Sequence, residues 1–138
     1  MTGEREIRPK AGEAEKITIN LGHVDLGRID LLVAEGFYGT RTDLIRTAIR
    51  RELDRHEEAV RRSVERRDLE LGLRRWSRAD LEKARAAGVK LSIQVLGLAV
   101  IDPDVTPELA LDTIASIHVL GALQASPAVK AALRDRIR

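Results

Sequence analysis

The chain has no cysteine and few aromatic residues, and both shortages limit what it can be. Its 138 residues include one Phe, one Tyr and one Trp. Without cysteine, the chain cannot form a disulfide framework, a thiolate zinc site or a cysteine nucleophile, which fits a reducing compartment. Because aromatic rings are so scarce, any core must be built from Leu, Ile, Val and Ala. Apolar residues make up 43% of the chain, so the volume for such a core is present.

Long apolar runs are missing as well. The longest, Val95 to Ile101, is far shorter than the roughly 20 residues that a membrane-spanning helix needs. The charged N-terminus, MTGEREIRPKAGEAEK, does not resemble a secretory signal. We therefore expect a soluble, cytoplasmic protein without membrane contact.

The chain also lacks an excess of positive or negative charge. The chain carries 24 basic and 22 acidic residues, a net charge of +2. Bulk charge therefore does not indicate a nucleic-acid partner. Any contact with nucleic acid must depend on where individual side chains lie.

The first structured segment follows residues 1–14, which we expect to be a flexible arm because they are charged and lack periodicity. In KITINL, Lys16 to Leu21, apolar and polar residues alternate strictly, which predicts a half-buried strand. HVDLGRIDLLVAEG predicts a helix that ends near Gly36. A second helix is predicted from Thr40, which forms a variant capping box with Asp43. Residues 56–69 continue as a helical extension or linker.

Residues 70–138 predict a small α/β module. We expect a helix from Ser77 to Gly88, a strand from Val89 to Ile101, and further helices in TPELALDTIASI and SPAVKAALRDRI, with a strand in HVLGAL between them. The pattern Ile-x-Val-Leu-Gly at residues 93–97 recurs at residues 117–121. This internal repeat suggests stacked strand-helix units. The predicted fold class is therefore α+β, with an N-terminal strand-helix-helix domain at residues 15–55 and this module after it.

A single short strand leaves both of its edges unpaired. The simplest remedy is the same strand of a second copy, antiparallel about a two-fold axis. The two helices would then cover the apolar face, and Lys16, Thr18 and Asn20 of both copies would share the other face. A two-stranded ribbon fits the major groove of B-DNA, where Lys can donate to guanine and Asn can bind adenine bidentately. The start of the second helix adds Thr40, Arg41 and Thr42, whose amide and side-chain groups suit a phosphate.

These segments, KITINL and then GFYGTRTDLIRTAIRREL, resemble a ribbon-helix-helix DNA-binding domain of the CopG-like kind over Glu15 to Arg55. The resemblance implies an obligate homodimer through residues 16–21 and the two helices that follow. It also implies a ribbon in the major groove of double-stranded DNA, base-facing side chains at positions 16, 18 and 20, and a phosphate clamp at positions 40–42. Strands of that family often end in Leu-Pro-Glu, whereas this chain has Leu21-Gly22-His23, which affects how the first helix begins.

The leading hypothesis is a transcriptional regulator of the repressor type, with residues 70–138 serving assembly or protein contact, a higher oligomer included. Two alternatives stay open: an antitoxin whose C-terminal part binds a toxin, and a scaffold that uses the ribbon only to dimerise. We expect no enzyme, catalytic residue or cofactor. We expect no metal site either, because His23, His56 and His118 are scattered and Asp102 and Asp104 are better explained by a turn. The arginines of residues 61–75 alternate with acids, as on a solvated helix.

Overall fold

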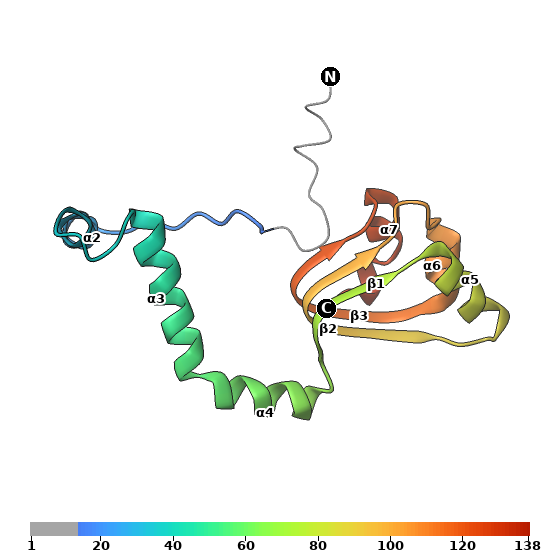
Figure 1. The fold of residues 1–138 in the computed structure, drawn as a ribbon. Helices are drawn as coiled ribbons and strands as arrows, with labels where there is room; N and C mark the ends of the chain where they lie inside the picture. Colours follow the sequence, from blue (N-terminus) through green and yellow to red (C-terminus); the bar gives the residue numbers. More distant parts are fainter. Residues whose placement is uncertain (1–13) are drawn as a thin grey trace, which may run out of the picture. The chain divides into compact units, whose positions relative to one another are not determined.

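The computed structural model describes residues 14–138, which divide into two compact units, residues 14–63 and residues 64–138 (Figure 1). Each unit is described by itself. The predicted arm lies outside the described residues apart from Ala14. The fold is mixed helix and strand, as the composition and periodicity predicted.

The N-terminal unit is helical. Its elements are α2 (His23–Ala34), α3 (Arg41–Arg55) and the first half of α4 (Glu57–Arg67). Both predicted helices are present, and α4 covers most of residues 56–69, the segment predicted as a helical extension or linker. Helix α2 begins directly after Gly22, which is extended and supplies no side-chain cap. Only His56 interrupts the helical hydrogen bonding between α3 and α4.

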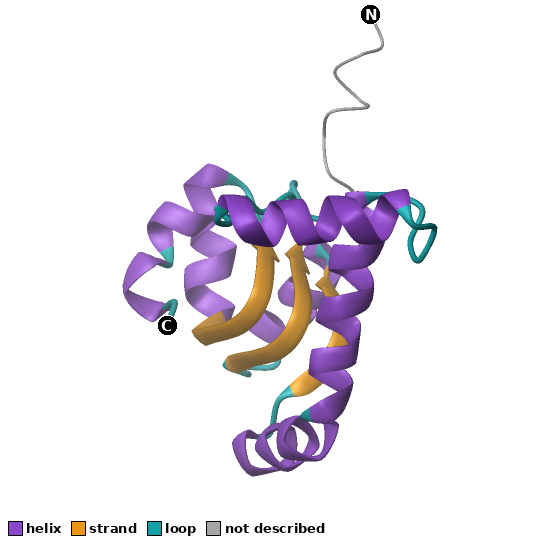
Figure 2. Cartoon of the chain, turned by 90° about the vertical axis from the view of Figure 1, so that its left-hand side faces the viewer, coloured by secondary structure: helices purple, strands orange, loops and turns teal. Residues whose placement is uncertain are grey.

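The C-terminal unit contains a three-stranded parallel sheet in the order β1-β2-β3 (Figure 2). Its elements follow one another as β1 (Glu70–Trp76), α5 (Arg78–Ala86), β2 (Leu91–Ile101), α6 (Pro107–Thr113), β3 (Ile114–Gln124), α7 (Pro127–Ala132) and the 3-10 turn η1 (Arg134–Arg136). Parallel neighbours need a crossover connection between them, and here each crossover contains a helix. The predicted strand-helix units are thus present.

The core, aliphatic as predicted except for the buried Trp76, lies between one face of this sheet and helices α5, α6 and α7. It joins alternate residues of the strands to apolar residues of the helices: Trp76, Ile93, Val95, Ala99 and Ile101 from β1 and β2, and Leu81, Leu109 and Val129 from the helices. The N-terminus of each helix is fixed by a hydroxyl cap. Ser77, Thr106 and Ser126 each accept a hydrogen bond from the amide three residues later. These caps explain why the helices begin where the sequence predicted.

A row of glycines crosses the sheet. Gly72, Gly97 and Gly121 pair with one another in register, and all have positive φ angles (117°, 139° and 125°). A Cβ on Gly97 would lie 2.2 Å from the carbonyl oxygen of Gly72, and one on Gly121 would lie 2.1 Å from that of Gly97. Glycine is therefore required at both positions. The Leu-Gly pair that the sequence repeats at residues 96–97 and 120–121 therefore occurs a third time, at Leu71-Gly72, which sequence reasoning missed.

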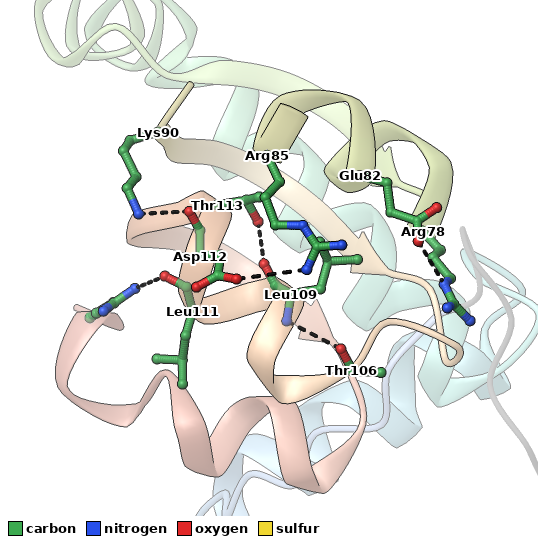
Figure 3. Close-up of polar contacts among 10 residues, drawn as sticks. Arg78, Glu82, Arg85, Lys90, Thr106, Leu109, Leu111, Asp112 and Thr113 are labelled. Carbon is green, nitrogen blue, oxygen red and sulfur yellow. Dashed lines mark hydrogen bonds and ion pairs between the residues drawn. The ribbon is translucent and has the colours of Figure 1, made fainter. Parts of the chain in front are cut away.

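The helix predicted over TPELALDTIASI is shorter than expected and gives way to β3 at Ile114. Side chains from outside the helix satisfy its last carbonyls (Figure 3). Arg136 donates to the carbonyl oxygens of Leu111 and Ile114, each at 2.7 Å, and Lys90 donates to that of Asp112 at 2.6 Å. Because these carbonyls have partners, the chain can leave the helix without burying an unpaired group.

The final predicted helix is also shorter, and it ends at Ala132 before the 3-10 turn. The last residues instead return to the sheet. Ile137 forms a parallel bridge with Ile117, and the Arg138 amide donates to the Ile117 carbonyl at 2.8 Å. Part of the outer edge of β3 is thereby paired.

Candidate nucleic-acid interface

Residues 16–21 form no strand in the single chain and are all exposed, so the predicted half-buried strand is not formed there. Ile17 and Ile19 are 72% and 58% exposed. Paired as a strand, the segment would place its apolar and polar residues on opposite faces, because alternate residues of a strand point to opposite sides. The segment has no strand partner within residues 14–138.

Helices α2, α3 and α4 bury no residue completely. Their exposed surface includes large apolar side chains at Val24, Leu31, Leu32, Ile49, Leu53 and Val60. Ile17, Ile19 and Leu21 are exposed as well, and a folded domain rarely leaves so many large apolar side chains uncovered. The N-terminal unit therefore lacks a core of its own as a single chain.

The N-terminus of α3 is well defined. The Thr40 hydroxyl accepts from the Asp43 amide at 3.0 Å, as the predicted capping box requires. The second half of the box differs, because the Asp43 carboxylate accepts from the Gly39 amide at 3.1 Å rather than from Thr40. The amides of Arg41 and Thr42 belong to the first turn, where the helix offers no carbonyl partner. They remain suitable donors for an anion.

The Arg41 side chain is held by α2. Its Nε and Nη2 atoms donate to the two carboxylate oxygens of Asp30 at 2.8 and 2.9 Å. These hydrogen bonds keep the pKa of the Asp30 carboxyl below its ordinary value and raise the pKa of Arg41. Two of the five donors of the guanidinium are thus engaged, and three are left for another acceptor. The pair also fixes α2 relative to the start of α3.

Sequence reasoning missed Asp30. The two residues are eleven positions apart, so no local spacing rule joins them. The only signal was an acidic residue on the first helix and a basic residue at the start of the second.

The charge of the candidate interface is balanced. Residues 15–55 contain seven basic residues (Lys16, Arg28, Arg41, Arg46, Arg50, Arg51 and Arg55) and seven acidic residues (Glu15, Asp25, Asp30, Glu35, Asp43, Glu52 and Asp54). The net charge of this segment is therefore zero. A DNA contact built on it would depend on a few oriented side chains rather than on a broad positive field.

The remaining candidate residues have structural partners. Arg61 and Arg62 both pair with Glu58 on α4, in line with the solvated-helix interpretation. Asp102 lies in a turn and accepts two hydrogen bonds from Arg75. The three histidines lie on different elements, and within residues 14–138 no group of three His, Asp or Glu side chains could hold a metal ion. Among the same residues no helix is long and apolar enough to cross a bilayer.

The capped second helix and the exposed helix pair are the features that the sequence predicted for residues 15–55. The chain matches the Ribbon-Helix-Helix transcriptional regulator family over residues 12–130. It belongs to that family, and the match covers the sheet module as well as the helix pair. Searches of curated proteins and of solved structures found no match.

Proposed function

We propose that the protein is a DNA-binding transcriptional regulator, acting as a repressor, whose homodimer reads the major groove with a ribbon formed by residues 16–21 of two chains. Membership of the family supports DNA binding and dimerisation. The observation that carries the proposal is the N-terminal unit without a core. If a second copy packs against this unit, it covers the exposed apolar residues and provides a strand partner for residues 16–21.

Pairing two copies of residues 16–21 puts the apolar side chains beneath the helices. Lys16, Thr18 and Asn20 then project from the opposite face of the ribbon, twice over. Their donors and acceptors match base edges in the major groove. We assign base reading to these three positions.

The phosphate contact falls at the start of α3. Thr40 caps the helix, and the amides of Arg41 and Thr42 are free to donate to a phosphate oxygen. Because Asp30 holds the Arg41 guanidinium, its remaining donors are presented in a fixed orientation. This contact positions the ribbon without reading sequence.

Balanced charge in residues 15–55 implies that one dimer binds modestly. Each phosphate contact adds to the salt dependence of binding, and this unit supplies few. The sheet module at residues 70–138 is folded, with its own core. We assign it to protein contact rather than to DNA.

Gel-shift titration on the DNA upstream of the protein's own gene tests the site. Lys16→Ala and Asn20→Ala are each expected to weaken specific binding by about tenfold or more, since a bidentate base contact is worth roughly 1–3 kcal/mol. Arg41→Ala removes a phosphate contact and is expected to weaken binding to specific and non-specific DNA alike. Arg78→Ala removes one positive charge from α5 and is the matched control, expected to bind normally. Unchanged binding in all three variants ends the assignment.

Light scattering with and without DNA separates regulator from scaffold. A dimer that binds DNA supports the regulator, whereas large concentration-dependent assemblies without DNA affinity support the scaffold. The antitoxin alternative predicts instead that a toxin-sized protein co-purifies through residues 70–138.

A further inference from the structure

The three-stranded sheet has a second face, opposite to the one that helices α5, α6 and α7 cover. Alternate residues of the strands lie on it, and none of them belongs to the core cluster. We call this surface the open face and define it by Leu71, Leu73, Leu96, Leu98, Leu120 and Ala122. Leu71, Leu73 and Leu120 are 71%, 46% and 42% exposed, although they stand on regular strands. Leu96, Leu98 and Ala122 are half-buried, and Val100 on the same face is only 9% exposed. The uncovered apolar part of the open face therefore lies at Leu71, Leu73 and Leu120.

Parallel sheets are almost always covered on both faces. An exposed and contiguous apolar surface therefore indicates a binding site. The open face carries little charge. Arg75 stands at one end of it, with its guanidinium already bound to the Asp102 carboxylate at 2.6 Å, and the polar pair Gln94 and His118 stands at the other. An occupant must present an apolar and mostly uncharged surface in return.

We propose that the open face packs against the open face of the second chain of the same dimer. An apolar, nearly uncharged surface is complementary to itself, and a two-fold axis brings identical patches together. This contact rests on the proposed function, because the paired N-terminal units would hold the two sheet modules together in one dimer.

The size of the face favours a tethered partner. Three strands spaced about 4.8 Å apart and about five residues of roughly 3.3 Å each give a footprint of only a few hundred Å². A stable independent interface buries about 800 Å² on each partner. A contact of this size is weak between free molecules. It becomes populated when a linkage raises the effective concentration to the millimolar range.

The absence of cysteine makes a direct test possible, because a single introduced thiol is the only one in the chain. Leu71→Cys and Leu120→Cys place a thiol on the open face at positions exposed in the single chain, so the fold of each module should tolerate them. Lys83→Cys places one on the exposed surface of α5 and is the matched control. The full-length chain is reacted with a maleimide, and circular dichroism checks that each variant is folded.

The open-face thiols are expected to react at least about tenfold more slowly than the control thiol. The protection should stay constant over dilution as long as light scattering reports a dimer. A short bifunctional maleimide should join the two chains from the open face but not from Lys83→Cys. Equal reaction rates at all three positions would overturn the inference. Protection that appears only with tetramers or larger species, or only with another protein present, would show that the occupant is not the partner chain.

A second variant separates this contact from the ribbon. Leu120→Lys should expose the face and raise the dimer dissociation constant by about tenfold, whereas Lys83→Glu should not change it. Asn20→Ala should weaken specific DNA binding by about tenfold or more while leaving the thiols protected. If DNA binding survives but the open-face thiols are fully reactive, only this inference fails. If the chain is a monomer that does not bind DNA, the proposed function fails first.

Discussion

Replacing Ile19 by alanine tests whether residues 16–21 are covered by a second chain. The Ile19 side chain is 58% exposed in the single chain. Complete burial of such a side chain is worth about 1.5–3 kcal/mol, so covering the exposed part contributes roughly 1–2 kcal/mol per chain. A symmetric dimer contains two copies, which brings the loss in Ile19→Ala to about 3 kcal/mol and the weakening of the dimer to about a hundredfold. A cavity left by the truncation would add to this loss.

The assay is dilution of the protein, with sedimentation velocity and the helical circular dichroism signal followed together. The neighbouring Thr18→Ala is the control, because alternation places Thr18 on the opposite face of the segment. It should leave the dimer intact while lowering DNA affinity. The reasoning is refuted if the Ile19→Ala chain dissociates no more readily than the Thr18→Ala chain, because the apolar face would then have no partner.

Two further predictions concern contacts within each unit. Gly97→Ala should lower the urea midpoint of unfolding more than Gly72→Ala does. Both glycines have positive φ, but only a Cβ at Gly97 would meet a neighbouring carbonyl oxygen, at 2.2 Å. Equal midpoints for the two variants would contradict this close approach. The pairing with Arg41 lowers the pKa of Asp30 from its ordinary value of 3.8, so its stabilisation is complete at neutral pH and is lost as the pH falls through the lowered value. Helicity followed between pH 5 and pH 2 should therefore depend less on pH in Asp30→Asn, and an unchanged profile would show that the pair does not support the helices.

Local signals in the sequence placed most helices correctly. The hydroxyl caps at Thr40, Ser77, Thr106 and Ser126 act on an amide only three residues away. A short segment therefore contains all the information that starts the helix. Alternation likewise located β2, because its apolar residues repeat at the strand period.

Features that depend on distant residues were not predictable in the same way. Helix α6 ends early because Arg136, more than twenty positions away, donates to the carbonyls of Leu111 and Ile114. Strand β1 was missed because charged residues, Glu70, Arg74 and Arg75, occupy much of it. Its identity follows from pairing with β2, which places Gly72 beside Gly97.

The candidate site shows the same division. The sequence indicated residues 16, 18, 20 and 40–42, because alternation and capping are local patterns. It gave no sign that the Arg41 guanidinium is bound to Asp30, because the ion pair joins two helices.

By itself, the sequence determined the period of each segment, the helix starts and the family resemblance, all of which follow from neighbours along the chain. Only the tertiary structure decided that three Leu-Gly pairs meet in one row, that one face of the sheet is covered and the other open, and that the N-terminal helices lack a core. The reason is physical: burial and close approach are properties of surfaces brought together from distant positions, and a local pattern does not specify its partner.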